Sequence, residues 1–188
     1  MHEPTENGVL EACELPSTVS YDVPVLDART TQFMRVTPRQ FLDFAMDVER
    51  YQQIDEKIRP VLWARRHADF TEFAFRPRVA GVRFPKWVAQ MRLDPERNRI
   101  DISLAPAPHN RIARLVVHYE ASFECTAVDR GVEVVRSERF RPRHPFRWAT
   151  DQFLRRVMPR LVEEELLLAK ELLESTPALG GDADASAR

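Results

Sequence analysis

The feature that most constrains the fold of this chain is a change in hydrophobic period, followed by one long helical segment. From residue 61 to residue 140, short runs of alternating apolar and polar side chains are separated by polar turns. Residues 146–174 then follow a helical period. Alternating runs only a few residues apart favour hairpins, so we expect an antiparallel sheet with a single long helix lying across it.

Six strands are predicted in this region, at residues 61–68, 70–77, 86–94, 99–105, 114–126 and 132–140. In the first of them, Val61 and Trp63 are expected on the same side. The clearest alternation puts on one face Leu115, Val117, Tyr119, Ala121, Phe123 and Cys125. The opposite face of that strand is polar, so one side of the sheet is expected to be buried.

The final segment is predicted to be a helix about 40 Å long, from its rise of 1.5 Å per residue. Its apolar stripe is expected to consist of Phe146, Ala149, Phe153, Val157, Leu161, Leu168 and Leu172. Pro159 lacks an N–H and crowds the carbonyl of Arg155, so a bend is expected near residues 155–159.

A strand and a short helix precede the sheet. Residues 19–36 are rich in strand-forming side chains, and Thr37, Pro38 and Gln40 form a helix start with a capping box. The apolar face of the following helix consists of Phe41, Phe44, Ala45, Val48 and Tyr51. This face is predicted to pack in the core.

Composition is that of one ordinary globular domain, with 188 residues, 44% of them hydrophobic. We expect a flexible segment at residues 1–18, a single domain at 19–175 and a disordered tail at 176–188. A net charge of −1 gives no general attraction to nucleic acid, and no apolar run approaches the ~20 residues of a membrane span.

Cys13 and Cys125 are far apart in the sequence and lack metal-ligand spacing. Free thiols in a reducing cytosol are the simplest interpretation, which predicts a cytoplasmic protein. The histidines are scattered, and neither a metal site nor a cofactor is expected. Hydrolase, metalloprotease and phosphate-loop patterns are absent from the sequence.

Two stretches carry a resemblance to a known family. They are residues 37–54 (TPRQFLDFAMDVERYQQI) and the end of the domain, from Gly131 through residues 144–174. Both resemble the SRPBCC superfamily, which includes START-like domains, polyketide-cyclase-like domains and the birch-pollen allergen group. The resemblance implies an α+β helix-grip fold: a curved antiparallel sheet of about six or seven strands, a short helical pair after the first strand, and a cavity under the long helix.

The side chains expected to line that cavity are mainly aromatic. They are Trp63, Phe73, Phe75, Trp87, Met91, Tyr119, Phe123, Phe153 and Val157. Apolar pockets with few polar groups suit hydrophobic ligands. The alternative is that these side chains only fill the core, although a buried Tyr119 hydroxyl would need a partner.

Strand 132–140 contains the strongest polar candidates. If Val132 and Val134 face inward, strict alternation brings Arg136 and Glu138 inward as well. A buried Arg–Glu pair is costly and is seldom kept for stability alone, so it would suit the orientation of a ligand. The alternative is a bulge, or an inner face marked by Val135.

The sequence therefore predicts a carrier or sensor that binds a lipid, a polyketide or a similar apolar molecule. The alternative is a polyketide cyclase/dehydratase, whose catalytic candidates are Arg136, Glu138, Tyr119 and, more weakly, His67. From Arg136 to Arg160 there are eight arginines and only two acidic residues, a local net charge of +6. This corner is predicted either to bind an anionic lipid headgroup or to be a solvated face with ion pairs.

Overall fold

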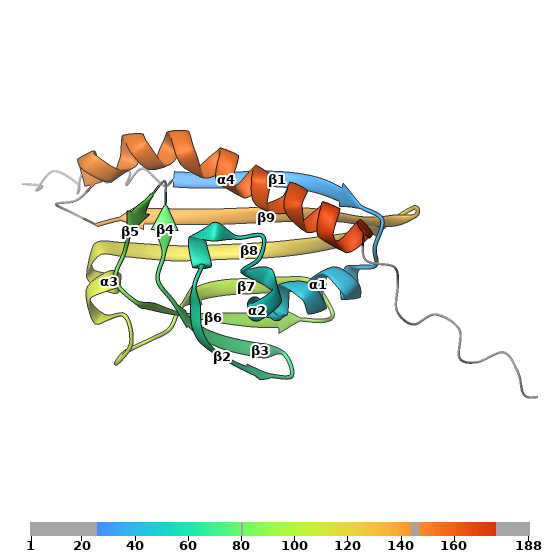
Figure 1. Ribbon diagram of the computed structural model, residues 1–188, viewed down its shortest axis with the longest axis horizontal. Coiled ribbons are helices and arrows are strands. Elements are labelled where there is room, and N and C mark those ends of the chain that lie inside the picture. The colour runs from blue at the N-terminus through green and yellow to red at the C-terminus, as the bar shows by residue number, and fades with distance from the viewer. Residues whose placement is uncertain (1–25, 80, 144–146, 176–188) are drawn as a thin grey trace, which may run out of the picture.

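The computed structural model describes residues 26–79, 81–143 and 147–175. Seven strands form one antiparallel sheet in the order β1-β9-β8-β7-β6-β3-β2 (Figure 1). Their bounds are β1 Leu26–Met34, β2 Val61–His67, β3 Phe70–Phe75, β6 Trp87–Asp94, β7 Arg99–Leu104, β8 Val117–Val128 and β9 Gly131–Pro142. A separate small hairpin is formed by β4 (Arg78–Val79) and β5 (Val82–Arg83). The segments predicted to be flexible, 1–18 and 176–188, lie outside the described residues.

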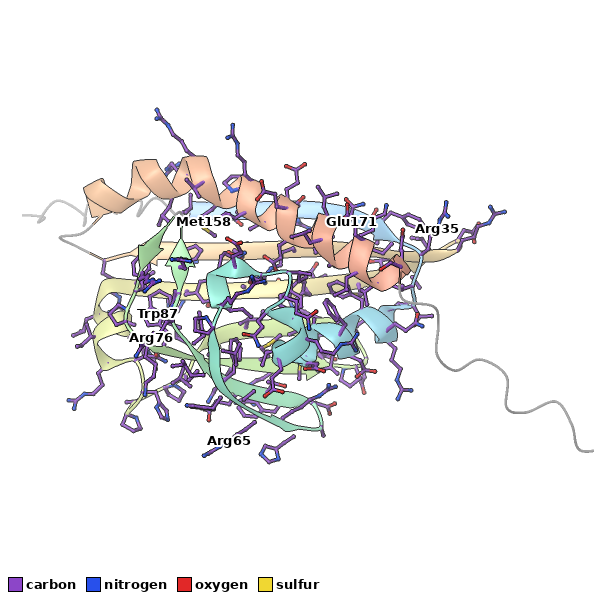
Figure 2. All side chains as sticks on the ribbon, viewed as in Figure 1. Arg35, Arg65, Arg76, Trp87, Met158 and Glu171 are labelled. Atoms are coloured by element: carbon purple, nitrogen blue, oxygen red, sulfur yellow. The ribbon has the colours of Figure 1, made fainter. Side chains whose placement is uncertain are left out.

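One long helix, α4 (Arg147–Ser175), lies along β1 and β9 (Figure 1). Its buried side chains are Met158, Val162, Glu165, Leu166 and Ala169, and Met158 is seen beneath the helix in Figure 2. Of the predicted stripe, Val157, Leu161 and Leu172 are partly buried as expected, but the prediction was wrong for Leu168, which is 44% exposed. Each residue turns the helix by about 100°, so a helix that buries Leu166 and Ala169 turns Leu168 outward. No helix in the described residues is long and apolar enough to cross a membrane.

The short helices after β1 form as the sequence predicts. Thr37 Oγ1 accepts from the Gln40 N–H and caps α1 (Pro38–Met46), and Gln40 Oε1 accepts in turn from the Thr37 N–H, which completes the capping box. Helix α2 (Val48–Tyr51) and the 3-10 turn η1 (Glu56–Ile58) follow directly. The apolar face of α1 and α2 is fully buried against the sheet, so this helical pair is part of the main core.

Two local predictions were wrong. A register irregularity between Val61 and Trp63 in β2 reverses the alternation, so these side chains face opposite sides of the sheet.

Residues 111–116 form a helix, α3 (Arg111–Val116), where we predicted the start of a strand. Strand β8 begins at Val117, the residue opposite the last residue of β9, so the residues before it have no strand to pair with. Leu115 is consequently exposed.

Gly131 begins β9 at the hairpin that pairs β9 with β8 and, on its other side, with β1. A Cβ atom added there would lie 2.1 Å from the carbonyl oxygen of Met34 in β1. Because the obstruction is backbone, the strand pairing must shift to accept any side chain. This position therefore requires glycine for close approach of the two strands.

We expect Gly131→Ala to lower the free energy of unfolding by about 2–3 kcal/mol, measured by urea denaturation. The matched control is Gly81→Ala, where the added Cβ meets open space and only the positive φ of +83° opposes it. That strain costs about 1 kcal/mol. Equal losses in the two variants would contradict the steric explanation.

Candidate functional site

A cluster of buried ionisable side chains lies between the sheet, α4 and η1. We define the buried charge cluster as Asp55, Lys57, Arg136, Glu138 and Glu165. Arg136 and Glu138 project from β9 and are 2% and 1% exposed. The strand continues the alternation of Val132 and Val134, which are also buried, so neither a bulge nor an inward Val135 occurs here. Glu165 comes from α4, and Asp55 and Lys57 come from the η1 turn.

The members of the cluster form a connected set of ion pairs. Arg136 Nη2 lies 2.6 Å from Glu138 Oε1, and Arg136 Nε lies 3.2 Å from Glu165 Oε1. Lys57 Nζ lies 3.0 Å from Glu138 Oε1 and 2.5 Å from Glu165 Oε2. Asp55 Oδ1 is 3.8 Å from the same ammonium. The Tyr51 hydroxyl donates a hydrogen bond to Glu165 Oε1. Lys57 and Arg136 are thus each paired with both Glu138 and Glu165, and Asp55 is paired with Lys57.

Arg136 also lies against an aromatic face. Its guanidinium carbon is 4.2 Å from the ring centroid of Phe123, a cation–π distance. The Phe123 ring packs edge-on against Phe41 and Tyr51, at centroid distances of 5.4 and 5.8 Å. This contact holds the Arg136 guanidinium against the Phe123 ring, next to its ion-pair partners Glu138 and Glu165.

Two buried polar atoms of the cluster have neither a hydrogen bond nor an ion pair among the described residues. They are Arg136 Nη1, a donor, and Glu138 Oε2, an acceptor. Buried polar groups are nearly always paired, because an unpaired group costs about 1–3 kcal/mol. One free donor and one free acceptor on neighbouring side chains suit a molecule that both accepts and donates a hydrogen bond.

Electrostatics keep most of the cluster ionised at neutral pH. Burial alone would lower the pKa of Arg136, but Glu165 and Glu138 outweigh it and hold this pKa above its ordinary value. Burial likewise opposes the charge on Lys57, and Asp55, Glu138 and Glu165 together raise the pKa of that ammonium. Burial would raise the pKa of Glu165, but Arg136 and Lys57 lower it below 4.5. These three groups therefore stay charged.

Asp55 differs from the other members. Burial raises its pKa from 3.8 to about 7, and the neighbouring Glu165 and Glu138 add to the rise while Lys57 opposes it. Its carboxylate accepts a hydrogen bond from the backbone N–H of Lys57, as the cap of η1. Protonation of Asp55 therefore removes one negative charge from the cluster, with the change near neutral pH.

The structure divides the sequence-predicted ligand residues into three groups. Phe73, Phe75, Met91 and Phe123 are buried in the main core, and Trp87 and Tyr119 are partly buried against it. Val157 is partly buried in a second core between α4 and β1. Trp63 packs on the other face of the sheet with Ala74, Val88 and Ala105, because of the irregularity in β2. The side chain of Phe153 lies outside the described residues.

Of the predicted catalytic candidates, Tyr119 lies near the cluster. Burial raises the pKa of Tyr119 well above its ordinary value, and the Glu138 carboxylate adds to this, so the hydroxyl stays neutral. Its ring packs on Phe140 at a centroid distance of 4.8 Å. His67, by contrast, is exposed on β2 and is remote from the cluster in register. It does not contribute to this site.

Sequence reasoning missed Tyr51, Asp55, Lys57 and Glu165 as members of the site. Glu165 ends a run of three glutamates at residues 163–165, which is typical of a solvated face, yet it continues the 158, 162, 165/166, 169 spacing of the buried stripe. That spacing was the available signal. For Asp55 and Lys57 no periodicity existed, because a three-residue turn is too short to show one.

The predicted arginine-rich corner is not one surface. Arg136 is buried, and Glu138 with it. Arg139 and Arg141 occupy alternate positions of β9 on the face turned away from the cluster. Arg156 and Arg160 are exposed on α4, which covers the opposite face of the sheet. Alternation along the strand therefore separates side chains that are neighbours in sequence.

Neither a reactive thiol nor a metal-ligand cluster competes with this site in the described residues. Cys125 is a free, buried thiol, and burial raises its pKa to about 12, so it is not a thiolate at neutral pH. No group of three or more metal-ligating side chains occurs in the part of the chain that the structure describes.

Comparison with known proteins relates the chain to a fold. No family profile and no curated protein matches the sequence. Among solved structures, the Zhui aromatase/cyclase of Streptomyces sp. R1128 has a TM-score of 0.68 at 16% identity, over 84% of this chain and all of that one. The protein TTHA0849 of Thermus thermophilus has a TM-score of 0.66 at 16% identity, over 81% of this chain and 99% of that one.

A START superfamily protein of Mycobacterium smegmatis also matches, with a TM-score of 0.58 at 12% identity, over 79% of this chain and 97% of that one. Identities this low show the fold alone. The predicted helix-grip fold, and the resemblance to SRPBCC proteins at the level of fold, are confirmed.

Asp55 makes the stability of the fold depend on pH in a defined direction. Its folded pKa lies above the unfolded value, so the folded chain binds the proton more tightly. The resulting stabilisation is complete below about pH 4 and is lost as pH rises through about 7. Over that window we expect the free energy of unfolding of the wild type to fall, relative to Asp55→Asn, by a few kcal/mol.

Chemical denaturation at several pH values measures this difference. Asparagine can still accept the capping bond from Lys57, so the variant changes the titration and keeps the cap. The control is Asp47→Asn, at the capping residue of α2, whose side chain accepts from the Arg50 N–H. Parallel pH profiles for wild type and Asp55→Asn would contradict the assignment.

Proposed function

We propose that this chain binds a small, mainly apolar molecule between the sheet and α4, as a carrier or sensor. The polar end of the molecule, a hydroxyl or carbonyl group, lies against the buried charge cluster. Its apolar body lies along the aromatic side chains of β3, β6 and β8. Lipids and polyketides both have this combination of a large apolar body and a few oxygen atoms.

The observation that carries this proposal is the pair of unpartnered atoms, Arg136 Nη1 and Glu138 Oε2. A ligand hydroxyl has the right chemistry for both atoms, because it can accept from a guanidinium and donate to a carboxylate. Removal of both groups from water is otherwise unfavourable. The binding of such a hydroxyl therefore offsets a cost that the unliganded protein already carries.

The cluster as a whole is better explained by function than by stability. Buried ion pairs seldom stabilise a fold more than apolar side chains of the same size. Here at least four charges are removed from water next to Phe123 and the apolar face of α1. Perturbed ionisable groups of this kind are concentrated at functional sites.

Aromatic side chains of β3, of β6 and of the segment before β6 support an apolar body for the ligand. Phe75 and Trp87 form an edge-on pair at a centroid distance of 6.3 Å, and Trp87 and Phe84 are 6.0 Å apart. Trp87 and Phe84 are only partly buried. The aromatic row thus continues from the buried interior towards the surface, along a path that an apolar molecule would follow.

A cyclase or dehydratase is the second candidate, supported by Asp55. A carboxyl group whose pKa is near 7 can give or take a proton at neutral pH, as general acid–base catalysis requires. Lys57, Arg136 and Tyr119 are donors that would hold a carbonyl oxygen as it gains negative charge. The fold-level likeness to an enzyme named as an aromatase/cyclase is consistent with this candidate.

Native mass spectrometry of the gently purified protein tests the binding proposal. We expect an adduct that disappears on denaturation, or one that forms when a long-chain alcohol or an aromatic polyketide is added. Glu138→Gln should weaken binding about tenfold or more, because it removes a charged acceptor. Glu120→Gln, an exposed substitution on the neighbouring strand β8, is the control and should leave binding unchanged. Absence of any adduct with these probes would overturn the proposal.

A measurement of turnover distinguishes the carrier or sensor from the cyclase or dehydratase. With an aromatic polyketide as substrate, a cyclase should lose at least about a hundredfold in rate in Asp55→Asn while the adduct still forms. Product analysis by liquid chromatography measures the rate. Binding without conversion by the wild type would exclude the cyclase and leave the carrier or sensor.

A further inference from the structure

One end of the molecule combines exposed aliphatic side chains with basic residues. Figure 1 shows α3 at the same end as the β4–β5 hairpin, the start of β8, the end of β9 and the start of α4. Ile112 and Leu115 on α3 are 75% and 68% exposed. No other large apolar side chain among the described residues is as exposed. They are three residues apart, and so lie on one face of the helix.

Basic side chains surround this apolar pair. We define the basic tip as Ile112 and Leu115 together with Lys86, Arg111, Arg114, Arg141 and Arg143, all of them exposed. Residues 81–87, 105–118 and 139–143 contain no aspartate or glutamate. Within the described residues, none of these five cations forms an ion pair with a carboxylate.

Specific contacts hold the basic tip together. The Asn110 side chain, at the start of α3, accepts from the Val88 N–H at 2.8 Å and donates to the Val88 carbonyl at 2.6 Å. It also donates to the Ala105 carbonyl at 3.0 Å. These bonds fix α3 to the start of β6, two residues from Lys86. Val117, directly after α3, pairs with Pro142, which places Arg141 and Arg143 beside the helix.

We propose that the basic tip docks on the surface of an anionic lipid bilayer. Basic residues are attracted to anionic headgroups, each by about 1 kcal/mol near the surface. Ile112 and Leu115 would enter the boundary between headgroups and acyl chains. Side chains as exposed as these protrude from the surface, which suits a deformable lipid layer better than a rigid protein partner.

The basic tip lies next to the accessible end of the aromatic row. Trp87 and Phe84 form the partly buried end of the aromatic row, and Trp87 directly follows Lys86. Figure 2 shows Trp87 and Arg76 towards this same end of the molecule. A docked protein would thus present the accessible end of its apolar interior to the membrane. Docking does not require a bound ligand, so a failure of docking can be distinguished from a failure of the proposed binding function.

Vesicle flotation with the purified full chain, without added ligand, tests the proposal. We expect binding to vesicles of equal parts phosphatidylcholine and phosphatidylglycerol, little binding to phosphatidylcholine alone, and release by high salt. The double variants Ile112→Ser/Leu115→Ser and Arg111→Gln/Arg114→Gln should each weaken binding about tenfold or more.

Matched controls alter similar side chains elsewhere. Leu167→Ser/Leu168→Ser changes two exposed leucines on α4, and Arg39→Gln/Arg97→Gln changes two exposed arginines far from the tip. Both controls should bind like the wild type. Circular dichroism confirms that each variant is folded. The proposal is overturned by absence of flotation with the anionic vesicles, or by binding that the tip variants and the controls reduce equally.

Discussion

Glu165 makes the interaction on which the rest of the structure depends. From α4 it reaches Arg136 of β9, Lys57 of η1 and the hydroxyl of Tyr51 in α2. One carboxylate thus joins the long helix, the sheet and the short helical segment, which are separate elements of the fold. A hydrophobic contact would tolerate sliding of the helix along the sheet, whereas these charge-assisted bonds fix its position.

Charge balance within the cluster limits what can bind there. Lys57 and Arg136 are already neutralised by Glu138 and Glu165, so a ligand carboxylate would bring an excess negative charge into a dry interior. A neutral hydroxyl or carbonyl brings none. The electrostatics therefore favour alcohols, phenols and ketones over fatty acids, and the protonation of Asp55 adjusts the balance near neutral pH.

The sequence predicted most of the fold because its elements are long and strongly periodic. Strand alternation in residues 132–140 also predicts that Arg136 and Glu138 face inward, although alternation alone does not distinguish a regular strand from a bulged one. The register of β9 with β1 is regular. A register irregularity does occur in β2, and nothing in the sequence indicates that it turns Trp63 and Val61 to opposite sides of the sheet. Glu165 and Lys57 could not be assigned to the site, since their burial depends on contacts between elements far apart in the chain.

Strand order has a consequence for how the protein is made. β1 pairs only with β9 in the sheet, and Leu26 faces Phe140 across more than a hundred residues of intervening chain. A nascent chain emerging from the ribosome thus holds β1 without a neighbour until β9 has been synthesised, and the helix that covers both follows later still. Closure of such a long loop makes folding slow, and the edge of β1 is open to other chains during that interval. The interval before β9 and α4 have been synthesised is therefore the stage at which this protein most needs protection from aggregation.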